Sequence, residues 1–453
     1  MSTSASTIHR IRHAFGIDRA VAFTVLARTW SSLAGLVTVA LISKFLTPEA
    51  QGYYYTFVSL VALQIVFELG FSFVILQLAT HECAHLTIDE HGMVQGDSRA
   101  HARLASVFQK ALRWYSMAAV LLVSVLIPTG LYFFSRHRHS GAGVEHRLPW
   151  CLVAAAAALT FQLDPILSFL EGCGYVARVA RLRFIQAMIG SMMAWTALLL
   201  HHGLFAPAMM ILGQAIVGFA WVAGRRRFLL GLLRWNCGQF RIRWLDEVWP
   251  FQWRIAVSWI SGYFVFQMFT PALFAFRGPV EAGQMGMSLS ISGALTAVCI
   301  SWVNTKAAPF GALIAQKRYA ELDHLFFRSL YQSLVICVLG GVCVWVGILY
   351  LNMAGIFYAK RMLEPISLGI LLLTAVVNHT WFAQAVYIRA HKQEKYLSIS
   401  LALAILLTLS TFTFGRVYGA RGMVAGYLLI SLVVGLGFGM RVFFKYRRIW
   451  HAQ

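Results

Sequence analysis

Twelve apolar stretches recur along the sequence and constrain its fold more than any other feature. An α-helix needs about 20 apolar residues to cross a bilayer core about 30 Å thick. We therefore predict an all-α, polytopic membrane protein with twelve transmembrane helices. The predicted spans are residues 21–43, 53–78, 111–134, 149–171, 184–203, 206–224, 253–276, 285–304, 330–352, 363–387, 397–415 and 422–444.

The composition supports this prediction and excludes a soluble enzyme. Of the 453 residues, 59% are hydrophobic and 12% are charged, whereas a soluble chain has about 25% charged residues. The formal net charge is +21, but a chain this hydrophobic is not primarily a nucleic-acid binder, and we expect no nucleic-acid partner.

The positive charges alternate from one connection to the next. If the N-terminus is cytoplasmic, 28 of the 38 Lys and Arg residues lie on the cytoplasmic side. This asymmetry follows the positive-inside rule, so we predict cytoplasmic N- and C-termini and a multi-pass topology. The basic residues before the first apolar stretch suit a retained first helix, because the stretch is long and no A-x-A cleavage site follows.

The longest cytoplasmic connection, residues 225–252, mixes arginines with Phe, Leu and Trp. Such a segment suits the surface of a bilayer that contains anionic lipids. We therefore predict an N-terminal six-helix lobe (1–229), a basic interfacial linker (230–252) and a C-terminal six-helix lobe (253–453).

A short motif is repeated in the two predicted lobes. The stretch from Leu46 reads LTPEAQGYYYTFVSL, and the stretch from Arg277 reads RGPVEAGQMGMSLSI. Both place Pro, Glu-Ala, Gln and Gly at the start of an apolar helix. Six helices per copy would make the lobes parallel repeats around a central cavity, an arrangement typical of carriers.

Three ionisable residues lie within the first four predicted spans: Arg28, Glu68 and Asp164. Placing a charge within the hydrocarbon costs about 2.5–3.5 kcal/mol or more, so such residues usually have a partner or a function. One hypothesis places all three on the wall of the cavity, where Arg28 meets an anionic group and an acidic residue takes up a proton. The alternative is an ion pair that holds helices together.

Amides and a few other polar residues also occupy the predicted spans or their ends. They either bond between helices or form a wall suited to hydroxyl-rich substrates. His379 is a candidate proton relay or a simply hydrogen-bonded histidine. These candidates are Gln64, Gln162, Gln267, Asn304, Lys306, Asn378, His379 and Gln384.

One motif suggests an enzyme. Residues 81–85 read HECAH, which matches the H-E-x-x-H pattern of zinc peptidases. The motif follows an apolar stretch without an evident third ligand, and the seven cysteines form no CxxC pair. A polar helix end is the simpler interpretation. We predict no enzyme activity, no metal and no cofactor, and no phosphate-binding loop is present.

Residues 45–53 (FLTPEAQGY) and 67–71 (FELGF) resemble the oligosaccharide flippases, the Wzx-like polysaccharide biosynthesis family, which belongs to the same superfamily as the multidrug and toxin extruders. The resemblance implies flipping of a polyprenyl-diphosphate-linked oligosaccharide across the bacterial inner membrane by alternating access. The product would be O-antigen, capsule or exopolysaccharide. It also implies coupling to a H⁺ or Na⁺ gradient, with a polysaccharide polymerase and glycosyltransferases as partners.

Carried over to this sequence, the resemblance gives Arg28 the role of a cavity cation and Glu68 that of the family's acidic position. Few cations lie deep in the spans, so rim residues Arg113, Arg254 and Lys306 are further candidates for binding the diphosphate. The alternatives are a cation-coupled drug or metabolite antiporter of the same fold and a membrane zinc peptidase that uses the HECAH motif.

Overall fold

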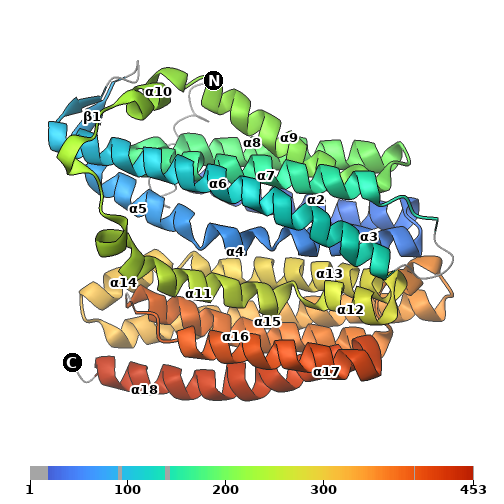
Figure 1. The fold of residues 1–453 in the computed structure, drawn as a ribbon. Helices are drawn as coiled ribbons and strands as arrows, with labels where there is room; N and C mark the ends of the chain where they lie inside the picture. The colour runs from blue at the N-terminus through green and yellow to red at the C-terminus, as the bar shows by residue number, and fades with distance from the viewer. Residues whose placement is uncertain (1–18, 90–93, 138–142, 392, 452–453) are drawn as a thin grey trace, which may run out of the picture. The chain divides into compact units, whose positions relative to one another are not determined.

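The computed structural model describes residues 19–89, 94–137, 143–391 and 393–451, and α-helices dominate this part of the chain (Figure 1). The first half contains α2 (Arg19–Phe45), α3 (Pro48–Val61), α4 (Gln64–Glu68), α5 (Phe71–Cys83), β1 (Leu86–Ile88), β2 (Val94–Gly96), α6 (Ser98–Arg136), α7 (Arg147–Leu170), α8 (Val176–Leu199) and α9 (Ala206–Ala223). The second half contains α10 (Arg226–Arg234), α11 (Trp249–Phe266), α12 (Phe269–Arg277), α13 (Pro279–Asn304), α14 (Ala307–Ala315), α15 (Tyr319–Met353), α16 (Pro365–Ala390), α17 (Leu397–Ile430) and α18 (Gly439–His451).

Short elements link several of these helices. Antiparallel pairing of β1 with β2 forms a two-stranded hairpin. The remaining turns of helix are η1 (Glu171–Tyr175), η2 (Gly203–Phe205), η3 (Gly238–Phe240), η4 (Trp244–Val248), η5 (Phe357–Arg361) and η6 (Ser431–Phe438).

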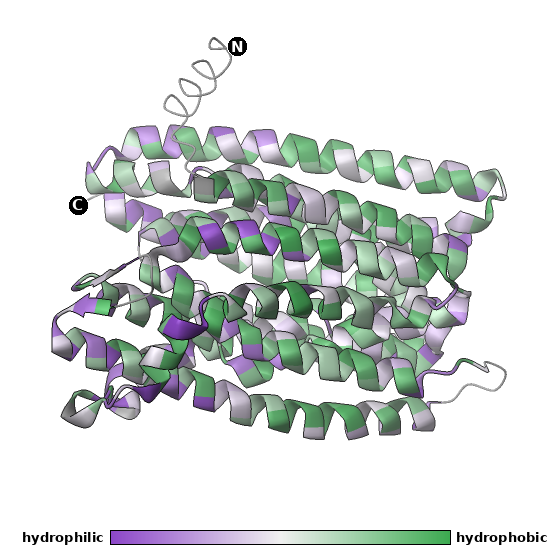
Figure 2. Ribbon diagram, turned by 90° about the horizontal axis from the view of Figure 1, so that it is seen from above, coloured by the Kyte–Doolittle hydropathy of each residue, from purple (hydrophilic) through white to green (hydrophobic). Residues whose placement is uncertain are grey.

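The helices are long and apolar enough for a multi-pass membrane protein. Within the described residues, eight continuous helical stretches could cross a membrane, and two bent pairs raise the number to ten. Figure 2 shows hydrophobic residues along the middle of the helices and many of the hydrophilic ones toward their ends. The most apolar part of α15 has a mean hydropathy of 2.6, and only 11% of it is buried, as expected for a helix that faces lipid.

Two of these stretches are too long for a single crossing. Residues Arg147–Leu199 and Leu397–His451 span 53 and 55 residues, more than twice the length that one span requires. Each contains a glycine with a positive φ angle, Gly174 (89°) and Gly419 (62°), where the regular helix is interrupted. With these interruptions, each of the twelve predicted spans lies mainly within helix.

The chain divides into two compact units. The first comprises the residues up to Thr38, Leu63–Phe133 and Glu145–Ala256, and the second comprises Val39–Ala62, Phe134–Val144 and the residues from Val257 onward. The lobe boundaries expected from the sequence stay a prediction.

In the second unit, the two copies of the repeated motif pack against each other. Pro48 begins α3 and Pro279 begins α13. A Cβ atom added to Gly52 would lie 1.9 Å from the Pro279 carbonyl oxygen, and one added to Gly283 would lie 2.9 Å from the Gly52 nitrogen. Gln51 donates hydrogen bonds to the carbonyl oxygens of Gly283 and Arg361, both at 2.9 Å. The glycines of the motif therefore permit a helix contact that no larger residue would allow.

In the first unit, polar side chains of α6 hold the segment that follows α9. Arg103 is ion-paired with both Glu82 of α5 (2.8 Å) and Glu247 of η4 (2.6 Å). The Gln109 amide donates to carbonyl oxygens in the last turn of α10 and just after it, those of Leu232 and Trp235, both at 2.9 Å. These contacts fix the basic linker, residues 230–252, to helices that precede it in the sequence.

Candidate functional site

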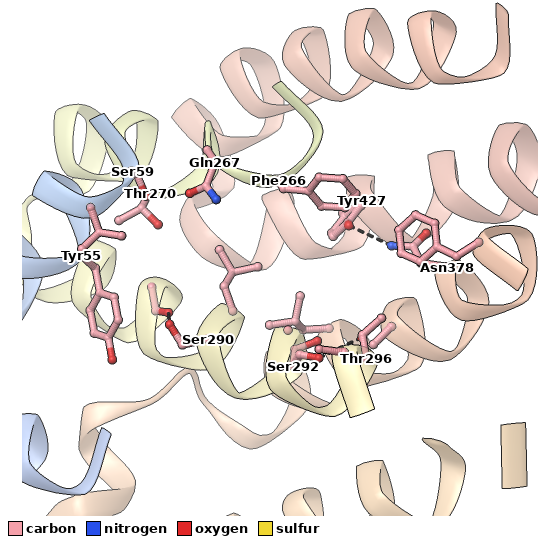
Figure 3. A pocket seen from close by; sticks show the side chains of 18 of the residues that line it. Tyr55, Ser59, Phe266, Gln267, Thr270, Ser290, Ser292, Thr296, Asn378 and Tyr427 are labelled. Carbon is pink, nitrogen blue, oxygen red and sulfur yellow. Dashed lines mark hydrogen bonds between the residues drawn. The ribbon is translucent and has the colours of Figure 1, made fainter. Parts of the chain in front are cut away.

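A cavity of about 520 Å³ lies within the second unit. Four groups of helices form its wall: α3, the break between α11 and α12, α13, and α16 with α17 (Figure 3). The break positions Gln267, because α11 ends at Phe266 and α12 begins at Phe269 with a bend of 41° between them. The side chain of Gln267 then points into the cavity.

The lining of this cavity combines apolar with hydrogen-bonding side chains and carries no Asp, Glu, Lys, Arg or His. Its hydrogen-bonding side chains are hydroxyls and amides, which can each donate and accept. They are Tyr55, Ser59, Gln267, Thr270, Ser290, Ser292, Thr296, Asn378 and Tyr427. The remainder of the wall is apolar and includes the rings of Phe266 and Phe382.

A hydrogen-bond chain fixes the amide at one end of the cavity. Trp381 donates from Nε1 to Asn378 Oδ1 at 3.0 Å, and Asn378 Nδ2 donates to the Tyr427 hydroxyl at 2.8 Å. Because both contacts orient the amide, its polar atoms are presented in a single arrangement. Such preorganisation reduces the entropy lost when a ligand binds.

Two glycines of α13 shape the cavity. Gly286 accommodates Tyr55, since an added Cβ would lie 2.4 Å from Tyr55 Cβ. At Gly293, an added Cβ would meet no atom within 4 Å. Gly293 therefore faces free space in the cavity and contributes room for a ligand.

A second polar group, in the first unit, surrounds a break in the second predicted span. Leu69 and Gly70 both adopt left-handed backbone conformations and separate α4 from α5. Glu68 ends α4, and its charge interacts with Asp164 of α7. Ser72 hydrogen-bonds to the Tyr115 hydroxyl at 2.8 Å beside this pair. The structure therefore brings together the two predicted acidic residues.

Arg28 is separate from this acidic pair. Its side chain is exposed on α2, and it forms no ion pair with any residue that the structure describes. Glu171, at the end of the same span as Asp164, pairs with Arg183 at 3.0 Å. Whether Arg28 contacts a substrate stays a prediction.

Most other predicted residues lie outside the cavity of the second unit. Gln162 donates to Ser116 at 3.0 Å, so this amide bonds between α7 and α6. Gln64 is half-buried on α4, Arg113 and Arg254 are exposed, and Asn304 and Lys306 lie at the end of α13. Of the predicted polar residues, Gln267 and Asn378 line the cavity.

His379 and Gln384 are buried between helices. The Nε2 atom of His379 lies 2.8 Å from the Ser333 hydroxyl, and Gln384 accepts a hydrogen bond from Tyr396 at 2.9 Å. These contacts match the alternative in which such side chains bond between helices.

The HECAH residues have no zinc-site geometry. Glu82 is buried and ion-paired with Arg103, while the His81 side chain is 78% exposed. Within the described ranges, no group of three or more His, Cys, Asp or Glu residues could hold a metal ion. In a zinc peptidase the glutamate of this motif activates a metal-bound water, whereas Glu82 is paired with an arginine.

Seven hydrogen-bonding residues of the cavity did not appear among the sequence candidates: Tyr55, Ser59, Thr270, Ser290, Ser292, Thr296 and Tyr427. Hydroxyl residues are common in transmembrane helices because they can bond to their own backbone, as Ser290 does to the Gly286 carbonyl at 2.9 Å. One signal was available. Gly286, Ser290, Gly293 and Ala297 follow i, i+4, i+7, i+11 spacing and mark one small-residue face of α13.

The fold is similar to that of several solved transporters. An inward-facing multidrug-resistance MATE transporter of the MOP superfamily aligns with a TM-score of 0.63 at 14% identity, covering 92% of this chain and 98% of that one. The lipid II flippase MurJ, in an inward closed conformation, aligns at 0.56 and 14% identity, covering 95% and 90%. A MOP-superfamily transporter from Pyrococcus furiosus aligns at 0.52 and 13% identity, covering 94% of each chain.

At these identities the comparisons show the fold alone. The chain is an all-α polytopic membrane protein with a MATE- and MurJ-like transporter fold, as the fold prediction stated. No family model matches the sequence, and no curated protein matches it either.

Proposed function

We propose that this protein is a flippase of the bacterial inner membrane that moves a polyprenyl-diphosphate-linked oligosaccharide by alternating access. One observation carries the proposal: the cavity of the second unit is lined by nine hydroxyl and amide side chains and no charged one. The similarity to MurJ, a lipid II flippase, supports the fold that this function needs.

The chemistry of the cavity fits the saccharide part of such a cargo. Sugar hydroxyls both donate and accept hydrogen bonds, as do the hydroxyls and amides of the lining. The rings of Phe266, Phe382 and Tyr427 offer apolar faces for the C–H faces of a pyranose. A volume of about 520 Å³ lies in the range of small-ligand sites, about 300–1,000 Å³.

The diphosphate must bind elsewhere, because a doubly charged group in an uncharged, partly apolar cavity would lack a countercharge. The sequence candidates Arg28, Arg113, Arg254 and Lys306 stay predictions for the cations that bind the diphosphate. The lipid chain would remain in the bilayer.

A second candidate function is cation-coupled antiport of a drug or metabolite. The acidic pair Glu68 and Asp164 beside the helix break in the first unit favours it, because such a pair can exchange a proton or a cation for substrate. Both functions could be coupled to a gradient of protons or cations, and they differ in the molecule that is transported.

Binding measurements on the detergent-purified protein separate these functions. The ligands are a short-chain polyprenyl-diphosphate disaccharide, the same prenyl diphosphate without sugar, and a cationic dye. We expect the disaccharide lipid to bind more tightly than the sugar-free lipid. Binding of the dye alone, with no contribution from the sugar, would contradict the flippase and support the antiporter.

A further inference from the structure

An arginine cluster in the first unit has no role in the proposed transport cycle. It surrounds Tyr175, the residue before α8. The guanidinium carbon of Arg178 lies 5.3 Å from the centroid of the Tyr175 ring, and that of Arg225 lies 5.7 Å from it. Arg225 also lies over the Trp221 ring at 3.4 Å. The two cations thus share one aromatic ring.

Among the residues that the structure describes, no ion pair joins Arg178 or Arg225 to a carboxylate. The hydrogen bond that Arg225 makes goes to the Trp221 carbonyl at 2.9 Å, and its buried Nε has no partner. The nearby Glu171 is paired with Arg183. Burial lowers the pKa of Arg225, and the positive charge of Arg178 lowers it further. Two like charges held together without a countercharge favour an anion between them.

Two helices add to the positive potential at this place. Val176 begins α8 and Arg226 begins α10, and no side chain caps either helix. The N-terminus of a helix carries about half a positive charge. Arg226 and Arg227, in the first turn of α10, are exposed and contribute two more cations.

The other residues of α10 point to a lipid as the source of the anion. Phe228, Leu229 and Leu232 are buried in the first unit, which fixes the helix. Leu230 and Leu233 are 44% and 36% exposed, and Trp235, directly after the helix, is 40% exposed. Exposed apolar residues next to arginines are typical of a helix at the surface of a bilayer, where its apolar side enters the acyl region.

A hollow of about 630 Å³ beside Tyr175 and Arg178 provides room for a headgroup. Asp89 also lines this hollow. A phosphodiester bound by the arginines would leave the rest of the headgroup in this hollow.

We propose that the Arg178–Tyr175–Arg225 cluster binds the phosphate of an anionic phospholipid whose acyl chains contact Leu230 and Leu233 of α10. The site goes beyond the proposed transport function, since it would hold a bilayer lipid and not the cargo. It lies in the segments that the sequence predicts to be cytoplasmic, where anionic headgroups attract arginine.

The test uses the detergent-purified full-length protein titrated with phosphatidylglycerol or phosphatidylcholine, with thermal stabilisation and retained lipid as readouts. We expect phosphatidylglycerol to stabilise the wild type more than phosphatidylcholine does. R178Q/R225Q should raise the half-saturating phosphatidylglycerol concentration at least about ten-fold, because the two cations that attract the headgroup are lost. An unchanged response would overturn the proposal.

Three controls make the result specific. R328Q/R441Q removes the same charge from two exposed arginines of the second unit and should leave the response unchanged. R178K/R225K keeps the charge and reports on folding if the glutamine variant is unstable. Glycerol 3-phosphate tests for a soluble anion: equal stabilisation by it, with no effect of L230Q/L233Q on the phosphatidylglycerol response, would overturn the assignment to a lipid.

Discussion

At the scale of single residues, the cavity of the second unit depends on what is missing from its wall. Gly293 contributes no side chain, and no charged side chain is present in the lining. Both features permit a bulky neutral ligand and disfavour an ion. Substitutions that add volume or charge therefore test the proposed cargo with little effect on the packing of the helices.

We predict that Gly293→Phe blocks transport while the protein still inserts and folds. The added ring enters free space, because a Cβ at this position meets no atom within 4 Å. Displacing a sugar from a filled cavity should weaken binding at least about ten-fold. Gly293→Ala is the matched control and should transport normally. Equal transport by both variants would show that the cargo does not occupy the cavity.

Asn378→Asp separates the two candidate cargoes. The change keeps the shape of the side chain but introduces a negative charge into a cavity without any. A neutral saccharide gains nothing from this charge, which must be desolvated, so its binding should weaken. A cationic drug should bind more tightly. The measurement is the binding of the disaccharide lipid and of the cationic dye to this variant, with Asn378→Ala as the control. Tighter binding of the disaccharide lipid to Asn378→Asp than to Asn378→Ala would contradict a neutral saccharide cargo.

At the scale of elements, the contact of α3 with α13 shows why the repeated motif contains glycine. A side chain on Gly52 would overlap the backbone at Pro279, which cannot move aside as a flexible side chain could. A similar contact at Gly172 places α5 against the turn before α8, where an added Cβ would lie 2.6 Å from the Leu76 carbonyl oxygen. Helix packing in both units therefore depends on backbone contacts.

We expect Gly52→Ala to lower the thermal midpoint of unfolding markedly, with a cost of about 1–3 kcal/mol or more. The comparison is Gly35→Ala on α2, where an added Cβ meets nothing within 4 Å. That control should be neutral or slightly stabilising, because alanine favours helix over glycine. A midpoint unchanged in both variants would contradict the close contact.

The ion pair that fixes the basic linker predicts a pH effect. Arg103 holds the pKa of Glu247 below its ordinary value. A lowered pKa means that the contribution to stability is present above the ordinary pKa, about 4.5, and is lost as the pH falls below it. Limited proteolysis of the segment after α10 should accelerate below about pH 4.5. Glu247→Gln should be cleaved faster at neutral pH and lose the pH dependence, and an unchanged pH profile would argue against the ion pair.

At the scale of the whole molecule, the hydropathy of the sequence was sufficient to predict where the membrane-spanning helices lie. Each predicted span lies mainly within helix, because about 20 apolar residues leave a chain in lipid few alternatives. The cavity was harder to predict. Gln267 and Asn378 stood out as amides, but Ser290 and Thr296 look like ordinary helix residues until the fold gathers them on one wall. The sequence hypothesis grouped Arg28, Glu68 and Asp164. In the structure Glu68 interacts with Asp164, and Arg28 forms no ion pair with a described residue.

The predicted topology can be checked with reporters. A reporter fused after Gln453 should be active on the cytoplasmic side, because twelve spans return the chain to the side on which it began. A second reporter, inserted in the connection after α6, should give the outside signal. An outside signal from the C-terminal fusion would contradict the twelve-span count.

The central claim concerns the cargo, and one measurement tests it most directly. Purified protein is reconstituted into vesicles that contain a polyprenyl-diphosphate disaccharide, and a membrane-impermeant glycosidase reports how fast the sugar reaches the outer surface. The wild type should move the lipid-linked sugar well above the rate of protein-free vesicles, and Gly293→Phe should reduce it to that background. A wild-type rate equal to background, in vesicles where the same protein exchanges a cationic dye, would contradict the flippase.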